Sequence, residues 1–402
     1  MKVLDSRFVD AGAIAVMLAG LTLAADGQDT RPPRPIPADA QIIFASDRDH
    51  ELDKWGMPAN ELYVATIDGV VTRITYDKLS DNHFEVSPNR RYVAVNRFSR
   101  GPADKNAQHG ALSLPNASAY FPLRDWKELW IVDTVQGTER RVVPQIDAGY
   151  GGLAWSPDSK WVYFATPSVT GKMDIVRVNI DTQRVEVVTR NLARLLGYGP
   201  DKKVWVSDVD LSQDGERLAF VVSGPDVNEG KDKPKIGTMK VDGSEAHMVT
   251  DGGPLAAGKR GVWPIGDFDP DMSPDGTRVA FERTTDVGFV TPSLTTFDIV
   301  VADMDGAHVK DISPPDNHAS EFIPSWGPDD EGKIVFTRLD PKVGMGPVVY
   351  DPQTGTRTLI PIGGNGTHVQ WIPSGRVQCQ GLICTAREKA AMEAIWHSNE
   401  GK

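Results

Sequence analysis

The feature that most constrains the fold is a short pattern that recurs six times along the chain. Each copy has an apolar residue, a turn similar to Ser-Pro-Asp-Gly, and a strand with alternating β-branched residues. The copies are "FEVSPNRRYVAVNRF" (from Phe84), "LAWSPDSKWVYFAT" (Leu153), "VDLSQDGERLAFVV" (Val209), "PDMSPDGTRVAFER" (Pro270), "PSWGPDDEGKIVFTR" (Pro324) and "VQWIPSGRVQCQG" (Val369). The aligned residues are Ser87, Ser156, Ser212, Ser273, Gly327 and Ile372, which are separated by 69, 56, 61, 54 and 45 positions. The pattern is therefore a repeat with insertions of variable length.

The turn explains how each repeat folds. Pro sets φ at the second turn position, Asp bonds nearby backbone, and Gly supplies the positive φ with which the chain re-enters the sheet. Each turn thus joins two antiparallel strands. A third strand follows, as in "ELYVATIDG" (from Glu61) or "DIVVADMDG" (from Asp298), and then a fourth, such as "VVTRIT" or "HVKDIS". Four short antiparallel strands per unit, without helical periodicity, predict the blades of an all-β propeller.

The two ends of the chain are expected to share one blade. The N-terminal part supplies second, third and fourth strands near Ile42, Glu61 and Val71 but no first strand, whereas the C-terminal part supplies a first strand at Thr367 to Ile372. One blade built from both ends closes a ring of six blades. Seven blades are the alternative, if "RVQCQGLICTA" begins a seventh blade; otherwise this segment is an extra hairpin outside the ring.

The first 25 residues have the features of a signal peptide. Lys2 and Arg7 precede the apolar run "AGAIAVMLAGLTLAA", which ends in small residues and is short for a membrane span. We expect cleavage near Ala24 or Ala25, with a buried helix as the alternative. The predicted organisation is a signal peptide (1–25), a Pro-rich linker (26–40), a propeller (41–390) and a C-terminal tail (391–402). The predicted location is the periplasm or the extracellular medium.

The net charge and the cysteine content restrict the classes of binding partner that we expect. The net charge of −12 argues against nucleic acid and anionic membranes and favours cations. No apolar run after Ala25 approaches spanning length, so we expect no membrane span in the mature chain. Cys379 and Cys384 are the only cysteines; in an oxidising compartment they either bridge a hairpin or remain thiols.

The repeat resembles the TolB-like propeller family, which is related to the WD-repeat propellers. "IIFASDRDHELDKWGMPANELYVATIDG" (Ile42 to Gly69) matches the second half of the family pattern, and the unit from Pro270 to Gly306 matches most of it. TolB itself carries an α/β domain before its propeller, whereas here only a short Pro-rich segment precedes the first strand. The resemblance implies a propeller and an envelope role, but propellers host many unrelated functions.

The starts of the innermost strands are rich in polar residues. Four positions before the aligned residues stand His83, Gly152, Asp208, Asp269, Ile323 and His368; two positions before them stand Glu85, Ala154, Asp210, Asp271, Ser325 and Gln370. Strand alternation places both sets on one side, toward the axial channel. We predict a divalent cation, Ca²⁺ or Mn²⁺, at His83, Asp208, Asp269 and His368, because oxygen-rich ligation with two imidazoles suits these ions. Further candidate ligands are Glu85, Asp210 or Asp271. The alternative is structural: these side chains bond neighbouring backbone N–H groups.

The longest links join second to third strands, and we name the face on which they lie the top face. These links are Asp47 to Asn60, Ser99 to Trp126, Gly224 to Pro234 and Thr284 to Thr296. Insertions commonly carry function. Trp55 and Trp126 are candidates for stacking on a ligand, and His318 and Glu321 for polar contacts with it.

Two functions remain open. The preferred one is an exported, non-catalytic propeller that binds an envelope or extracellular protein, peptide or glycan. The alternative is a metal-dependent enzyme that resembles oligogalacturonate lyases, which are propellers that act on acidic sugars. The chain contains no Gly-x-Ser-x-Gly elbow, which argues against a serine hydrolase of that plan.

Overall fold

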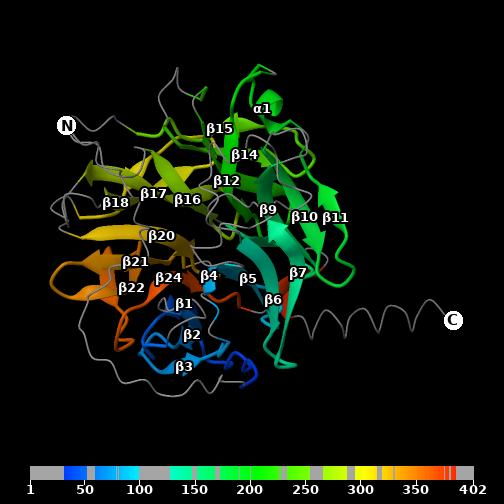
Figure 1. The fold of residues 1–402 in the computed structure, drawn as a ribbon. Helices are drawn as coiled ribbons and strands as arrows, with labels where there is room; N and C mark the ends of the chain where they lie inside the picture. Colours follow the sequence, from blue (N-terminus) through cyan, green and yellow to red (C-terminus); the bar gives the residue numbers. More distant parts are fainter. Residues whose placement is uncertain are drawn as a thin grey trace, which may run out of the picture.

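The computed structural model describes residues 31–51, 59–77, 79, 81–98, 127–146, 152–167, 173–189, 191–199, 201–224, 226–227, 233–253, 266–287, 295–314, 319–328, 331–374, 376–379 and 382–385. These residues form six four-stranded antiparallel sheets, arranged around a common centre as propeller blades (Figure 1). The prediction of an all-β, six-bladed propeller is confirmed. Within the described ranges the only helix is the short α1 (Leu192–Leu195).

Each blade runs from an innermost to an outermost strand. Blade 1 contains β24 (Thr367–Trp371), β1 (Ile42–Ser46), β2 (Glu61–Ala65) and β3 (Val71–Arg73). Blade 2 contains β4 (Asp81–Val86), β5 (Tyr92–Phe98), β6 (Lys127–Asp133) and β7 (Thr138–Ile146). Blade 3 contains β8 (Ala154–Trp155), β9 (Trp161–Pro167), β10 (Met173–Asn179) and β11 (Val185–Val187). Blade 4 contains β12 (Trp205–Leu211), β13 (Arg217–Ser223), β14 (Lys235–Lys240) and β15 (His247–Met248). Blade 5 contains β16 (Asp267–Met272), β17 (Arg278–Val287), β18 (Thr295–Asp303) and β19 (Lys310–Asp311). Blade 6 contains β20 (Ser320–Trp326), β21 (Ile334–Asp340), β22 (Gly344–Asp351) and β23 (Thr356–Leu359).

Blade 1 closes the ring in the predicted way. The C-terminal strand β24 pairs antiparallel with the N-terminal strand β1, with Ile42 opposite Trp371. Beyond the strand ends, the Ile372 N–H donates to the carbonyl of Gln41 at 2.8 Å. We call the pairing between β1 and β24 the seam.

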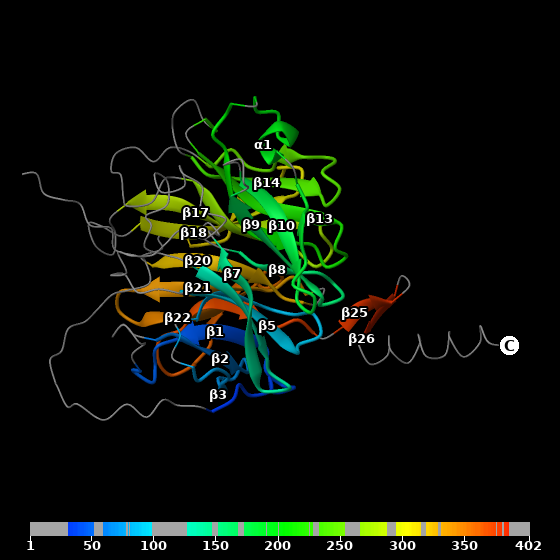
Figure 2. The same cartoon turned by 45° about the vertical axis from the view of Figure 1, so that its right-hand side comes forward.

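The segment after the seam forms a separate two-stranded sheet rather than part of a seventh blade. Its strands, β25 (Arg376–Cys379) and β26 (Leu382–Thr385), pair only with each other among the described strands, and the hairpin lies beside the ring (Figure 2). The register places Cys379 opposite Leu382 and Cys384 opposite Val377, so the two cysteines occupy diagonal positions.

The repeated turn has the predicted chemistry. In the turn of blade 4, Ser212 Oγ donates to Asp214 Oδ1 at 2.6 Å, and Asp214 Oδ1 accepts the Glu216 N–H at 2.9 Å. Gly215 then adopts a positive φ of 76°, which a residue with a Cβ adopts only at a cost. The Ser-to-Asp bond recurs at Ser156 and Ser273. These bonds fix the hairpins that join first to second strands.

The core lies between neighbouring blades. One apolar cluster combines residues of blades 1 and 2, and another combines residues of blades 4 and 5. Phe281 is fully buried there, and burial of such a side chain contributes about 1.5–3 kcal/mol. Trp155 and Trp326 are buried and Trp371 is partly buried in similar clusters.

The described part of the N-terminal segment, residues 31–40, contains no strand and packs against blades 1 and 2. The Arg34 N–H donates to the carbonyl of Ile74 at 3.0 Å. The Arg90 guanidinium donates to the carbonyls of Pro37 and Ala40. The predicted signal peptide lies outside the described residues. Across the described ranges, no helix is sufficiently long and apolar to cross a membrane.

Candidate functional site

The starts of the inner strands lie on the top face, beside the links that join second to third strands. In blade 4 the first residue of β12, Trp205, pairs with the last residue of β13, Ser223, after which the link to the third strand begins. In blades 2, 5 and 6 the inner strand likewise begins opposite a residue near the end of the second strand. Trp55, Trp126 and His318 lie outside the described residues, so their predicted part in ligand binding stays a prediction.

Glu321, the fourth predicted ligand-binding residue, is fully buried at the start of β20. Its carboxylate accepts hydrogen bonds from Arg338 Nη1 at 2.6 Å and from Arg357 Nη2, and Ser313 Oγ donates to it at 2.7 Å. Ser313 belongs to the end of the preceding blade. These contacts give Glu321 a structural role that the sequence did not indicate, and its role in ligand binding stays a prediction.

The same arrangement recurs in two other blades. An acid stands six positions before the aligned residue and pairs with an Arg of the second strand. The pairs are Asp81 with Arg97, Asp267 with Arg283 and Glu321 with Arg338. The constant interval of 16 or 17 residues between acid and Arg was the available sequence signal. We call these pairs, with the hydroxyl group that joins Asp81 or Glu321 to the preceding blade, the top latches.

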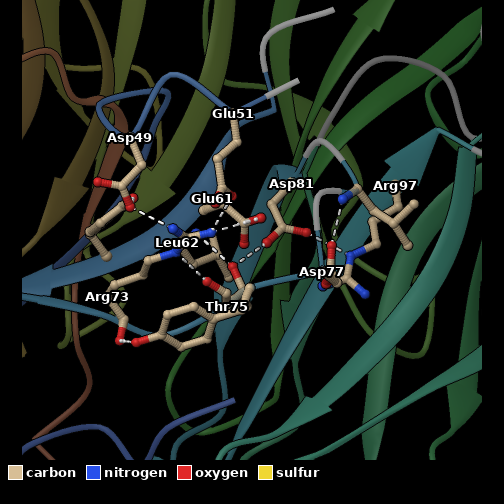
Figure 3. A network of polar contacts seen from close by, with 12 residues as sticks. Asp49, Glu51, Glu61, Leu62, Arg73, Thr75, Asp77, Asp81 and Arg97 are labelled. Carbon is tan, nitrogen blue, oxygen red and sulfur yellow. Dashed lines mark hydrogen bonds and ion pairs between the residues drawn. The ribbon is translucent and has the colours of Figure 1, made fainter. Parts of the chain in front are cut away.

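The latch between blades 1 and 2 contains the most charge (Figure 3). The Arg97 guanidinium, with only 1% of its side chain exposed, lies 2.5 Å from Asp77, 2.6 Å from Asp81 and 2.6 Å from Glu139. Thr75 of blade 1 donates to Asp81 at 2.8 Å. Burial raises the pKa of Asp77 to about 10, with a further increase from Asp81 and Glu139 that Arg97 opposes.

The residues two positions before the turns bind neighbouring blades together. Asp210 Oδ2 accepts the backbone N–H of Met272 at 2.7 Å, and Asp271 Oδ1 accepts the backbone N–H of Trp326 at 2.7 Å. Each bond crosses to the inner strand of the next blade. These are the backbone bonds that the structural alternative predicts, and a part for either Asp in a cation site stays a prediction.

Burial perturbs the carboxyl groups at this level. It raises the pKa of Asp210 to about 7. It also raises the pKa of Asp271 well above the usual range, and the charge of Asp210 adds to the effect. The pKa of Glu85 is raised by burial and by the charges of Asp271 and Asp210. These three carboxyl groups thus interact around the axis.

The residues four positions before the turns lie nearer the top face. The rings of His83 and His368 meet edge to face, with centroids 4.8 Å apart. Asp208 accepts hydrogen bonds from the Gly152 N–H at 3.2 Å and from Ser207 Oγ at 2.9 Å. The first of these bonds joins blades 3 and 4.

Glu282, on the second strand of blade 5, also belongs to this level. Its Oε2 accepts the Ile323 N–H at 2.9 Å. Burial raises the pKa of Glu282 to about 8; the charge of Asp208 raises it further, whereas hydrogen bonds from Ile323 and Asp269 lower it. Sequence reasoning missed Glu282, because alternation along a second strand does not show which residue reaches a neighbouring inner strand.

Strict alternation along the inner strands is wrong at one point. The register shifts between Ser207 and Asp210 in β12, where three steps oppose two on β13, so the strand contains a bulge. Asp208 lies in this bulge with a φ of 48°, and Asp269, Ile323 and His368 share a positive φ. The two predicted sets of axial residues are therefore separated by a bulge, not by regular pleating.

Among the residues that the structure describes, no group of three or more His, Cys, Asp or Glu side chains is placed to hold a metal ion. A Ca²⁺ or Mn²⁺ site at His83, Asp208, Asp269 and His368 stays a prediction, and it requires these side chains to rearrange.

Comparison with known proteins supports the fold. No protein-family model and no curated protein matches the chain. Among solved structures, TolB from Acinetobacter baumannii is similar with a TM-score of 0.53 and 17% identity, over 84% of this chain and 68% of that one. A protein assigned as TolB from Agrobacterium tumefaciens gives a TM-score of 0.46 and 14% identity, over 83% and 99% of the two chains. An oligogalacturonate lyase in complex with manganese gives 0.42 and 12%, over 82% and 74%. At 17% identity, the similarity to TolB from Acinetobacter baumannii shows the propeller fold alone.

Proposed function

We propose that this protein is an exported, non-catalytic β-propeller that binds a protein, peptide or glycan at its top face and at the mouth of its axial channel, in an envelope role similar to that of TolB. The supporting observation is that carboxyl groups near the axis accept hydrogen bonds from the backbone of neighbouring blades. Asp208, Asp210 and Asp271 each accept a backbone N–H of a neighbouring blade. Carboxyl groups used in this way hold neighbouring blades in register. The raised pKa values of Asp210 and Asp271 follow from burial, so these values are not in themselves a sign of catalysis.

The charge at the channel mouth indicates the chemistry of the ligand. Asp208, Asp269 and Glu282 interact at this level, and the chain carries a net charge of −12. Complementary charge speeds association and gives specificity. We therefore expect the bound segment of the ligand to carry positive charge.

Binding of a lysine-rich peptide, with a glutamate-rich peptide of equal length as the comparison, tests this proposal by calorimetry. We expect the double variant Asp208→Asn with Asp269→Asn to bind the lysine-rich peptide about tenfold more weakly, which equals about 1.4 kcal/mol. Asp214→Asn is the matched control, since Asp214 lies in a turn of the opposite face. Equal affinities for the wild type and the double variant would contradict the proposed site.

Two further measurements address the other parts of the proposal. Turnover of acidic oligosaccharides by the wild-type protein with added Mn²⁺ would favour the lyase alternative over the binding role. N-terminal sequencing of protein recovered from the envelope or the medium should find a chain that begins close to Asp26. Recovery of intact Met1 in a cytoplasmic product would argue against export.

A further inference from the structure

The loop that leads into β24 contains the only Asn–Gly step of the sequence, Asn365–Gly366. Asn365 is exposed in this loop, whereas Gly366 is buried directly before the closing strand. Because Gly has no Cβ, its backbone nitrogen approaches a preceding side chain with little steric hindrance. We propose that Asn365 is a site of spontaneous deamidation and that opening of the seam controls its rate.

The reaction requires only water. The backbone nitrogen of Gly366 forms a bond to the side-chain carbonyl carbon of Asn365. The amide nitrogen of Asn365 leaves as ammonia and takes the proton released by the Gly366 nitrogen. Water then opens the five-membered succinimide at one of its two carbonyl carbons. One product is aspartate, and the other is isoaspartate, in which the main chain passes through Cβ.

The closed seam opposes the first step. The Gly366 N–H donates to the carbonyl of Met345 at 3.2 Å, so its nitrogen is held in the fold. Ser46 Oγ donates to the carbonyl of Asn365 at 2.5 Å, and Arg48 Nη1 donates to the carbonyl of Ile362 at 3.0 Å. Ser46 ends β1, so these bonds clamp the loop to the seam. The reaction therefore proceeds from locally opened molecules, whose population reflects the stability of this region.

The product interferes with reclosure. Isoaspartate adds one atom to the main chain at residue 365 and displaces the carbonyl that Ser46 contacts. Gly366, the next residue, is too closely packed to shift and absorb the extra atom. A Cβ at this position would lie 2.5 Å from Ile362 Cδ1 and 2.9 Å from Phe44 Cδ2. Deamidation thus weakens the seam whose opening allowed it, and modified molecules open more often.

Peptide mapping by mass spectrometry tests the proposal on full-length protein incubated at mildly alkaline pH. We expect aspartate and isoaspartate to accumulate at Asn365 before any other asparagine. Ser46→Ala removes one clamp and should speed the conversion about threefold to tenfold, since loss of one hydrogen bond raises the open population by that factor. Asn365→Gln is the matched control, because its longer side chain does not form a five-membered ring with Gly366.

Each outcome bears on one part of the proposal. An unmodified Asn365 after a synthetic peptide of the same loop has converted would overturn the assignment. Equal rates in the wild type and Ser46→Ala would overturn the control by the seam. If Ser46→Ala does not fold, the opening rate is measured instead in the wild type, by hydrogen exchange at the Gly366 amide. Deamidation at Asn365 that is faster than this opening rate would refute the mechanism. Aged wild type should also melt about 2 °C below aged Asn365→Gln; equal melting would refute the effect on the seam.

Discussion

Replacement of Arg97 by Met is the sharpest test of the top latches. Met retains much of the apolar stem but removes the cation that pairs with Asp77, Asp81 and Glu139. All three carboxyl groups lie within 2.6 Å of the guanidinium, and Asp81 is completely buried. Removal of one partner from a buried ion pair costs about 3–5 kcal/mol, because the remaining charge is left uncompensated.

This loss should appear as a lower melting temperature. For a chain of this length, about 3–5 kcal/mol corresponds to about 4–8 °C in a thermal scan. Arg177→Met is the matched control, since Arg177 pairs with Glu186 at 2.6 Å but keeps 32% of its side chain exposed. A pair of this kind is worth about 1 kcal/mol or less, so the control should melt within about 2 °C of the wild type.

A second variant separates charge from packing. Adding Asp77→Asn and Asp81→Asn to Arg97→Met removes two of the stranded carboxyl groups, so it should recover part of the lost stability. If Arg97→Met melts together with Arg177→Met, or if the added Asn residues recover nothing, the latch does not stabilise the junction of blades 1 and 2 by the proposed mechanism.

Three other expectations follow from the seam and the axial residues. Burial raises the folded-state pKa of Asp210 to about 7 and of Glu282 to about 8, above their unfolded values of about 4; the folded state then binds more protons, so stability should fall as pH rises from about 4 to about 8. Melting curves across this range check the sign, and Asp210→Asn should flatten the curve; stability that rises through this window would refute it. Truncation from Gly363 removes β24 and leaves β1 unpaired, so we expect aggregation by light scattering; a monomeric product that melts like the full chain would argue against the role of the seam. If Ca²⁺ or Mn²⁺ binds among His83, Asp208, Asp269 and His368, chelator should lower the melting temperature and added metal restore it, whereas an unmoved transition without stoichiometric metal leaves a purely structural channel.

The repeat predicted the architecture because its signal is local. Ser212, Asp214 and Gly215 make their defining contacts with one another, so the sequence of a single turn reveals its geometry. Ring closure was predictable for a similar reason: one end lacked the strand that the other supplied.

The conformation and contacts of the residues near the axis were harder to predict from the sequence. Asp208 and Asp269 adopt left-handed φ in bulges, which the period-two pattern of a strand does not reveal. The latch that joins Thr75, Asp81 and Arg97 depends on the contact between two blades. The sequence pattern shows the acid and the Arg, but it does not show which hydroxyl group the fold places beside them.

The seam also determines when the protein is able to complete its fold. Blades 2 to 6 are each contiguous in the chain, whereas blade 1 pairs Ile42 with Trp371. Such a distant contact carries a large loop-closure entropy until the intervening blades have formed, so closure is expected to be a late kinetic step. During synthesis from the N-terminus, β1, β2 and β3 wait without their inner strand until nearly the whole chain has emerged. A chain in this state has an open sheet edge at β1. Another chain, which leads to aggregation, or a chaperone then competes with β24 for this edge.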